Sequence, residues 1–580
     1  MRFLLGAFIL ITTVAQAASP QRTFGPDTTS TGVNTGPPTL QPGLTCSAAG
    51  PAPEPLTCTG HLASDLDGTM LDVTAWAPQD TLPHPLAVAI HGWGGSKNSN
   101  NKYARQMTDA GFAFLSYSTR GFGDSYGEVN LADVNVEGAD LRSMIGQVAE
   151  QSELHVDAAN VAVFGASYGG AHAFLAALRT SFTSPHGQNI VIRTVAPLAT
   201  WSELTGALRP NGQGDPIEPA GGFKFSFVEG LYFGGCKDTP VCTNYPNYLK
   251  IWNAWITTTE PSNATAIDRQ IVDGFSGYRS IYWQSEFWNG AAAARLPIFM
   301  AQGWTDDLFP VGETLRMYNA LKSIDRNYPI ALYLGDVGHP RARNKPEEVE
   351  FVIDQLLDWL KWYLKNEGTQ PSLDVQAAIT GSKDAPFIPE DDVIRVPAYD
   401  QLATGSIERS FSDTQLLTFN PASIGGVPWD PFVMLAAEEL AFNPNDVPSD
   451  FVPGDVAVYE VPVSALASQG LLIAGQPIVT MKIKQLSPTG VREQINVRLF
   501  DVKPDATKTL ITRGTYTIDG TPRWIGTEKI AVTTYGNVWR AEATDIPRLE
   551  ISNVDSPYIA PSKIPSVTEV SKVTLTIPVR

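Results

Sequence analysis

Positive charge is scarce in this chain. Its 41 Lys and Arg residues face 60 Asp and Glu residues, which gives a formal net charge of -19. The negative electrostatic field of such a protein repels the phosphates of nucleic acids and anionic lipids. We therefore expect no nucleic acid partner.

Long apolar runs are missing after the first twenty residues, so the mature chain should have no membrane span. Before that point, Arg2 precedes an apolar stretch and an Ala15-Gln16-Ala17 site. This order is typical of a secretory signal peptide, here over residues 1–17. The sequence predicts export, either out of the cell or into the periplasm, with cleavage after Ala17 or Ala18.

Cysteine is rare as well. The four cysteines form two close pairs in the sequence, Cys46 with Cys58 and Cys236 with Cys242. Three pairings are formally possible, and the two local ones need the least chain organisation in an oxidising compartment. No histidine stands at ligand spacing from either pair, so we predict disulfides and no metal or other cofactor.

The 580 residues divide into regions of different pattern. Residues 18–58 are rich in Thr, Pro and Gly and predict an extended arm. Short apolar strands then alternate with helical stretches over 59–200 and 295–384, which predicts an α/β domain with a mostly parallel sheet. Residues 385–580 contain short strands divided by turn residues, typical of a β-sandwich or jelly roll.

An aromatic-rich insert, residues 201–294, interrupts the α/β pattern. Its many Phe, Tyr and Trp side chains must be buried, and we expect a helical lid over the carboxyl ends of the strands, where ligands bind in such sheets. The alternative is an extra helical layer with a small core of its own.

One serine stands in a setting typical of a nucleophile. The run Gly165-Ala166-Ser167-Tyr168-Gly169 follows an apolar strand and precedes an alanine-rich helix. A sharp strand-to-helix turn needs small neighbours and exposes the serine hydroxyl. Small residues also serve helix packing, so the motif indicates a nucleophile only because a strand precedes it and a helix follows it.

Ser167 needs a base and an acid that orients the base. In this architecture the three residues follow one another along the chain in the order Ser, acid, His. Four of the seven histidines precede the serine, while His172 and His186 lie on its helix and just after it. His339, directly after the last apolar strand, remains as the base.

The acid should follow an intermediate strand. The run Gly303-Trp304-Thr305-Asp306 begins where such a strand ends. We choose Asp306 as the acid, with Asp307 as its rival. Asp336 is a weaker candidate because it lies only three residues before His339. For the oxyanion hole we predict the backbone N–H groups of Trp93, in His91-Gly92-Trp93-Gly94-Gly95, and of Tyr168.

With these residues in place, the chain resembles α/β-hydrolases of the cocaine esterase and X-prolyl dipeptidyl peptidase family. The catalytic part is similar through HGWGG, STRGFGDSYGE, GASYGG, GWTD and the Gly338-His339 pair. The carboxyl-terminal part is similar through GQPIVTMKI, LFDVKPD and ITRGTY. Here the resemblance implies the same triad of Ser167, Asp306 and His339, and a terminal jelly roll.

The sequence thus predicts a secreted serine hydrolase that acts on a small-molecule ester or amide, or on a peptide. The HGWGG loop and the aromatic insert favour esters. An X-prolyl dipeptidyl peptidase is the alternative, and it would need an acidic or tyrosyl group in the insert to hold the substrate's amine. A non-catalytic binding protein on the same scaffold is a third hypothesis.

Overall fold

The computed structural model describes most of the chain. It covers residues 20–27, 40–212, 220–258, 266–381, 385–419, 446–447, 456–467, 470–487, 492–518, 527–555, 558–560, 562 and 564–580. The predicted signal peptide lies outside the described residues. Within them, no helix is long and apolar enough to cross a bilayer.

A large mixed sheet forms the centre of the catalytic part. Its strands are β1 (Gly43–Ala48), β2 (Leu56–Ala63), β3 (Met70–Ala77), β4 (His84–Ile90), β5 (Ala113–Tyr117), β6 (Val156–Ala166), β7 (Ser181–Thr183), β8 (Asn189–Leu198), β9 (Ile298–Gly303), β10 (Ile330–Gly335), β11 (Val375–Ala378) and β12 (Val393–Val396). Among the described residues their order is β1-β2-β3-β5-β4-β6-β8-β9-β10-β11-β12, with β7 beside β8. The strands from β5 through β4 to β11 run parallel, and those beyond them pair antiparallel.

Helices cover both faces of this sheet, as the alternating strands and helices predict. They are α1 (Asn101–Asp109), α2 (Glu137–Ala149), α3 (Tyr168–Ala176), α9 (Val311–Ile324) and α10 (Pro346–Leu360). Successive side chains of a strand point to opposite faces. Accordingly, Leu86 and Val88 of β4 share a core with α2 and α3, whereas Ala87 and Ala89 share another with α1 and α10.

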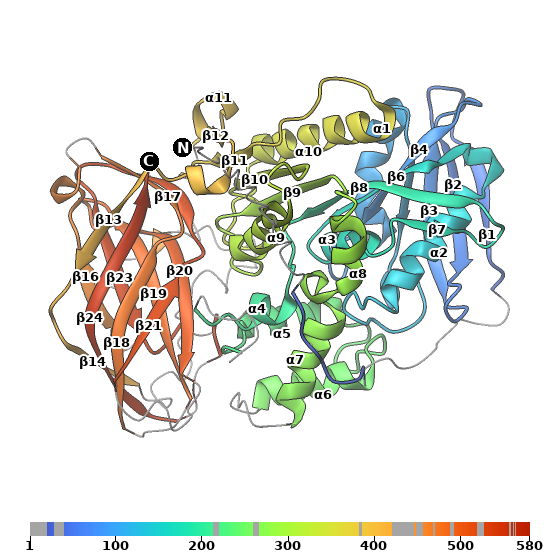
Figure 1. The fold of residues 1–580 in the computed structure, drawn as a ribbon. Coiled ribbons are helices and arrows are strands. Elements are labelled where there is room, and N and C mark those ends of the chain that lie inside the picture. The colour runs from blue at the N-terminus through green and yellow to red at the C-terminus, as the bar shows by residue number, and fades with distance from the viewer. Residues whose placement is uncertain are drawn as a thin grey trace, which may run out of the picture.

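The aromatic insert is helical and packs into the main core. It contains α4 (Leu204–Leu208), α5 (Phe225–Gly235), α6 (Asn247–Thr258), α7 (Ala266–Tyr278) and the short α8 (Ser285–Phe287). Trp252 of α6 lies edge-on to Phe275 of α7, with 5.5 Å between ring centroids. Both belong to the same buried cluster as Val88 of the sheet, so the described part of the insert shares its core with the sheet. Figure 1 shows α4 to α7 grouped beside the sheet, toward the C-terminal part.

The C-terminal part consists of two antiparallel sheets. One contains β13 (Gly405–Ser410), β14 (Gln415–Phe419), β17 (Leu471–Gly475), β18 (Ile478–Ser487), β21 (Thr527–Thr533), β22 (Asn537–Ala541) and β24 (Ser566–Val579), and the other β15 (Asp446–Val447), β16 (Val456–Glu460), β19 (Glu493–Val502), β20 (Lys508–Ile518) and β23 (Ile546–Ser552). Met481 and Leu575 from the first sheet and Val497 and Leu549 from the second share one core. This confirms the antiparallel all-β region predicted from the sequence.

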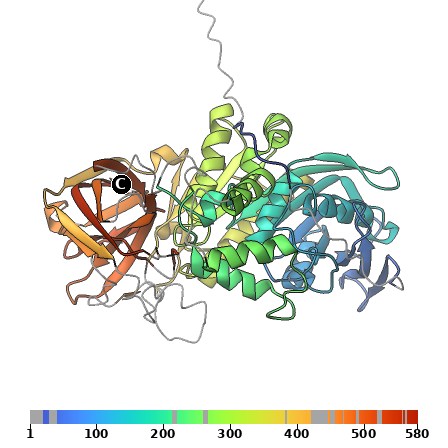
Figure 2. The same ribbon diagram turned by 90° about the horizontal axis from the view of Figure 1, so that it is seen from below.

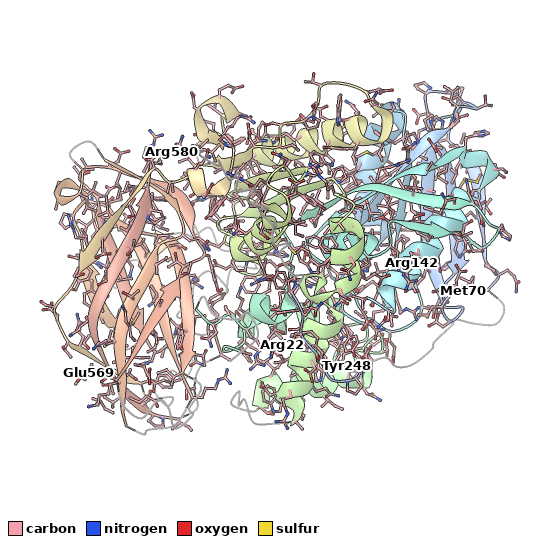
Figure 3. The ribbon with its side chains drawn as sticks, in the orientation of Figure 1. Arg22, Met70, Arg142, Tyr248, Glu569 and Arg580 are labelled. Atoms are coloured by element: carbon pink, nitrogen blue, oxygen red, sulfur yellow. A yellow bond between two sulfur atoms is a disulfide. The ribbon has the colours of Figure 1, made fainter. Side chains whose placement is uncertain are left out.

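Seen from below, the C-terminal sheets lie to one side of the insert and the catalytic sheet to the other (Figure 2). In Figure 3, Glu569 and Arg580 mark the two ends of the long strand β24, and Tyr248 marks the insert. The insert bonds directly to the C-terminal sheets: the Gly212 N–H donates to the Thr515 carbonyl at 2.7 Å. The two regions therefore meet beside the catalytic sheet.

Two predicted boundaries differ from the structure. The arm expected over 18–58 contains β1 and the start of β2; these two strands extend the catalytic sheet, because β1 pairs antiparallel with β2 and β2 with β3. At the other boundary, the catalytic sheet passes residue 384, because β12 pairs with β11 after the short helix α11 (Pro389–Asp392). β1 (GLTCSA) carries few apolar residues, so its sequence resembles that of a loop, and β12 (VIRV) is only four residues long.

Candidate active site

Ser167 occupies the turn between β6 and α3. Its backbone has φ 59° and ψ -121°, a conformation that a non-glycine residue adopts only when its surroundings impose it. The flanking glycines explain how the turn fits: a Cβ on Gly169 would lie 2.1 Å from the Ile90 carbonyl oxygen, and one on Gly165 would lie 2.7 Å from the same oxygen. The small residues of the motif are therefore required by the close approach of β4.

His339 reaches Ser167 from the loop after β10. Its Nε2 atom lies 2.8 Å from Ser167 Oγ, although the two residues are 172 positions apart in the sequence. The ring packs edge-on against Phe309, at 5.1 Å between centroids. The histidine chosen by elimination thus stands within hydrogen-bond distance of the serine.

Asp306 stands on the other side of the imidazole. One carboxylate oxygen, Oδ2, lies 2.8 Å from His339 Nδ1 and also accepts the His339 backbone N–H at 3.2 Å. The other, Oδ1, accepts the backbone N–H groups of Leu308 and Phe309 at 3.0 and 2.9 Å. The side chain is fully buried, so these bonds fix the carboxylate in one orientation.

The two rival carboxylates point elsewhere. Asp307 pairs with Arg341 at 2.9 Å, and Asp336 bonds to Thr305 and Arg343. Among the described contacts neither reaches His339. Of the three carboxylates weighed from the sequence, Asp306 alone is hydrogen-bonded to this histidine in the described part of the chain.

The HGWGG loop after β4 lies against the serine. A Cβ on Gly92 would be 4.0 Å from Ser167 Cβ. Buried His91 accepts the Thr119 backbone N–H at Nε2, and its Nδ1 lies 2.7 Å from the Gly92 carbonyl. Burial lowers the pKa of His91 to about 4, so the ring is neutral and fixes the loop.

Trp93 and Tyr168 line the same pocket as Ser167. The Trp93 indole donates to the Leu231 carbonyl of the insert at 2.6 Å, and its ring packs edge-on against Tyr168. Tyr168 is the first residue of α3, where backbone N–H groups lack partners within the helix. Both residues predicted for the oxyanion hole therefore border the serine.

An apolar pocket, which we call the insert pocket, opens at Ser167 beneath the insert. Its volume is about 100 Å³. The lining residues are Trp93, Leu131, Ser167, Tyr168, Trp201, Leu204, Leu208, Val228, Leu231, Tyr232, Leu249, Trp252, Asn253, Ile256, Phe275 and Phe309. Helices α4 to α7 supply most of them, and the list contains no carboxylate. A group bound here would be apolar and uncharged.

Side chains from two other regions of the chain hold the loop that carries Asp306. Lys224 of the insert donates to the Leu308 carbonyl at 2.7 Å. From the C-terminal sheets, the Tyr558 hydroxyl donates to the Asp307 carbonyl at 3.0 Å, and Arg513 Nε lies 3.6 Å from the Asp307 carboxylate. These residues were missed in the sequence because no motif links positions so far apart.

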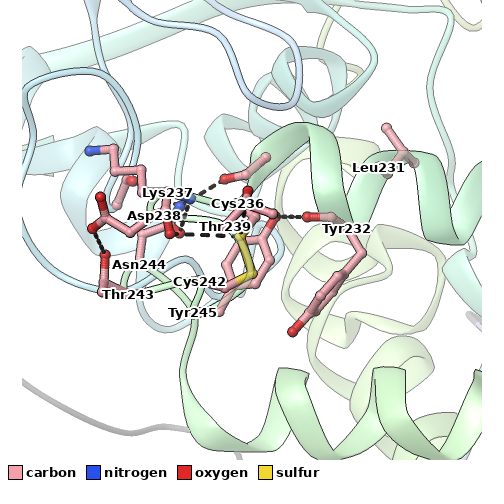
Figure 4. The surroundings of a disulfide bond; sticks show 12 residues. Leu231, Tyr232, Cys236, Lys237, Asp238, Thr239, Cys242, Thr243, Asn244 and Tyr245 are labelled. Carbon is pink, nitrogen blue, oxygen red and sulfur yellow. Dashed lines mark hydrogen bonds between the residues drawn. A yellow bond between two sulfur atoms is a disulfide. The ribbon is translucent and has the colours of Figure 1, made fainter.

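The two predicted disulfides are present. Cys46 and Cys58 face each other on β1 and β2, and Cys236 joins Cys242 in the insert. Figure 4 shows the second bridge with Asn244 and Tyr245 beside it. The Asn244 side-chain amide donates to the Gly121 carbonyl, so this bridge lies where the insert meets the catalytic loops.

Comparison with known proteins agrees with this geometry. Residues 67–341 match the model of the X-Pro dipeptidyl-peptidase (S15) family. A curated protein of Escherichia coli, the uncharacterized 31.7 kDa protein in the traX-finO intergenic region, is 35% identical over 106 residues, which are 18% of this chain. The match spans about a third, 36%, of that relative's length.

Solved structures share the fold over nearly the whole chain. An aminopeptidase from a marine sediment Thaumarchaeota archaeon aligns with TM-score 0.62 and 12% identity, covering 94% of this chain and 99% of its own. A CocE/NonD family hydrolase from Staphylococcus aureus gives 0.57 and 10%, covering 93% and 98%. An alpha-amino acid ester hydrolase gives 0.60 and 14%, covering 90% and 97%.

Identities this low show the shared fold, and the family model adds the match in the catalytic sequence. The family model spans the serine, the acid and the histidine, while the structural matches extend through both C-terminal sheets. Together they confirm the resemblance of this chain to the cocaine esterase (CocE/NonD) and X-prolyl dipeptidyl peptidase family.

Proposed function

We propose that this chain is a secreted serine hydrolase that cleaves carboxylic esters through an acyl-enzyme on Ser167. The observation that carries the proposal is the hydrogen-bonded series Ser167–His339–Asp306, with 2.8 Å at each step. A serine hydroxyl becomes nucleophilic when a base takes its proton, and the base works when an acid holds its ring.

Each group has a defined step. Ser167 Oγ attacks the ester carbonyl carbon while His339 Nε2 takes its proton. The buried Asp306 carboxylate keeps the proton on Nδ1 and stabilises the imidazolium. Backbone N–H groups of Trp93 and Tyr168 receive the negative charge that develops on the carbonyl oxygen.

The tetrahedral intermediate then collapses. The carbon–oxygen bond to the leaving group breaks as His339 donates its proton to that oxygen, which leaves as an alcohol. A water molecule, deprotonated by His339, attacks the acyl-enzyme by the same route, and a carboxylic acid and free Ser167 are formed.

The insert pocket favours an ester over an X-prolyl peptide. A peptidase of that type needs a group to hold the substrate's ammonium. Buried Glu203 caps α4 through the Thr205 and Gly206 N–H groups, exposed Asp238 bonds to Thr243, and Glu229 bonds to Asn253. None of these three carboxylates lines the insert pocket; Tyr232 of the insert does line it, and it offers an ammonium group a neutral hydroxyl instead of a negative charge. Two further candidates, Asp215 and Glu218, lie outside the described residues.

Two experiments test the mechanism and the substrate. A fluorophosphonate probe should label the wild-type chain and fail to label Ser167→Ala; equal labelling of both would exclude Ser167 as nucleophile. Hydrolysis of p-nitrophenyl acyl esters should exceed that of a Gly-Pro anilide in kcat/KM. A clear preference for the anilide would favour the dipeptidyl peptidase, which the family model supports.

Export is supported by the N-terminal sequence. When the gene is expressed with its first 18 codons, the chain recovered outside the cytoplasm should begin at residue 18 or 19. The two disulfides fit an oxidising compartment of this kind.

A further inference from the structure

A second cavity reaches Ser167 from the opposite direction. We call it the α1–α10 cavity, because Ser99, Asn100 and Tyr103 line it from the α1 side and Val349, Val352 and Ile353 from α10. Its volume is about 330 Å³, larger than that of the insert pocket. The lining also includes His91, Gly92, Ser167, His339 and Asn344.

The α1–α10 cavity continues to the protein surface. Tyr103, Asn344, Val349 and Ile353 also line a surface depression with polar residues around it, namely Lys102, Gln106, Glu350 and Asp354. A molecule could therefore enter or leave between α1 and α10 without passing the insert.

Gly92 keeps the inner end of the cavity open. A Cβ at this position would meet only the Ala166 carbonyl oxygen at 3.9 Å and Ser167 Cβ at 4.0 Å. Any larger side chain would extend into the space between the cavity and the serine. The absence of a side chain at Gly92 thus keeps the α1–α10 cavity connected to Ser167.

The position of the catalytic groups tells the two cavities apart. His339 lines the α1–α10 cavity and is absent from the lining of the insert pocket, whereas Trp93 and Tyr168 line the insert pocket. The histidine must protonate the leaving-group oxygen, which therefore has to lie within about 3 Å of Nε2. The side with the histidine is the side of the leaving group.

We propose that the α1–α10 cavity is the binding site for the alcohol part of the ester, and that the insert pocket holds the acyl part. This rests on the proposed ester hydrolysis. The bond that breaks joins the acyl carbon, held at Ser167, to the alcohol oxygen, which receives the proton of His339 and departs between α1 and α10.

The linings define the class of substrate. No Asp, Glu, Lys or Arg side chain lines either cavity among the described residues, and burial lowers the pKa of His91 so that its ring is neutral. Burying an unpaired charge in such surroundings is costly. The larger cavity lies on the alcohol side. The substrate is therefore a neutral ester of a compact apolar acyl group with a larger apolar alcohol.

Narrowing each cavity separately tests this assignment. Ile353→Trp fills the α1–α10 cavity at its outer end, away from the triad, and Val228→Trp fills the insert pocket. Ile388→Trp is the matched control, because Ile388 is 43% exposed and lines neither cavity. Two substrate series are compared: acetates of methanol, butanol and octanol, and p-nitrophenyl acetate, butyrate and octanoate.

Ile353→Trp should lower kcat/KM for octyl acetate about tenfold or more, the order expected when a hydrophobic pocket loses space. The kcat/KM for methyl acetate, and the ratios of kcat/KM between acyl chains of different length, should change less than about twofold, because these substrates do not need the lost space. Val228→Trp should lower kcat/KM for the long acyl chain and leave the dependence on alcohol length unchanged. Ile388→Trp should match wild type in both series. Fluorophosphonate labelling reports a folded site in each variant, and Ile353→Phe replaces Ile353→Trp if labelling is lost.

Two outcomes would overturn the proposal: an unchanged octyl-to-methyl ratio in a labelled Ile353 variant, or a change in acyl-length dependence instead. Failure of the proposed function itself gives a different result. In that case the wild-type chain hydrolyses neither ester series.

Discussion

Replacing Asp306 and Asp307 one at a time by asparagine should separate catalysis from stability at two adjacent positions. Both carboxylates are buried, and both substitutions preserve the side-chain shape. Their partners differ. Asp306 binds His339 and three backbone N–H groups, whereas Asp307 pairs with Arg341 and lies near Arg513.

In Asp306→Asn, the amide has one acceptor oxygen for four donors. If that oxygen keeps the two bonds to Leu308 and Phe309, the NH₂ group faces His339. Nδ1 must then become an acceptor, so the proton moves to Nε2, where it blocks the base. Loss of the acid in this way lowers kcat about 10⁴-fold in a serine triad. The melting temperature should change little, because Asp306 forms no ion pair with a Lys or Arg side chain among the described contacts.

In Asp307→Asn, Arg341 and Arg513 lose a buried negative partner. Breaking a buried ion pair costs about 3–5 kcal/mol, so the free energy of unfolding should fall by this order. Below the lowered melting temperature the triad is intact. The kcat of Asp307→Asn should therefore remain within about tenfold of wild type, whereas that of Asp306→Asn falls about 10⁴-fold.

The assay combines p-nitrophenyl acetate kinetics with differential scanning calorimetry on both variants at one temperature well below unfolding. If Asp307→Asn lost turnover and Asp306→Asn lost only stability, the acid would be misassigned by one residue. The hydrogen-bond reasoning would then fail.

The remaining predictions concern pH and the disulfides. Burial lowers the pKa of Lys224 to about 7, against about 10.4 in an unfolded chain. Between these values the unfolded chain binds the extra proton, so the free energy of unfolding should rise with pH, by about 1.4 kcal/mol per unit from this group. Lys224→Met should remove that slope in denaturant titrations at pH 7 to 10, and an unchanged slope would refute the assignment. The Cys46–Cys58 bridge closes a short loop and should contribute about 3 kcal/mol; Cys46→Ser with Cys58→Ser should expose the β1–β2 hairpin to proteolysis, and resistance equal to wild type would contradict this.

The sequence by itself determined the local features. Gly165 and Gly169 are needed by the crowded turn at Ser167, and chain order selected His339, because both requirements belong to short segments. Apolar periodicity likewise predicted the alternating strands and helices and the antiparallel C-terminal region. Close spacing in the sequence favoured both disulfide pairings, and the structure contains them.

Only the tertiary structure decided what depends on distant contacts. The sequence favoured Asp306 as the acid and left Asp307 as its rival. The direction of the loop, held by Lys224 and Tyr558, turns Asp306 toward His339 and Asp307 toward Arg341. The two cavities at Ser167 are likewise formed by segments more than a hundred residues apart. The physical reason is that a side chain's direction and the shape of an empty space depend on packing across the whole chain, which no local pattern encodes.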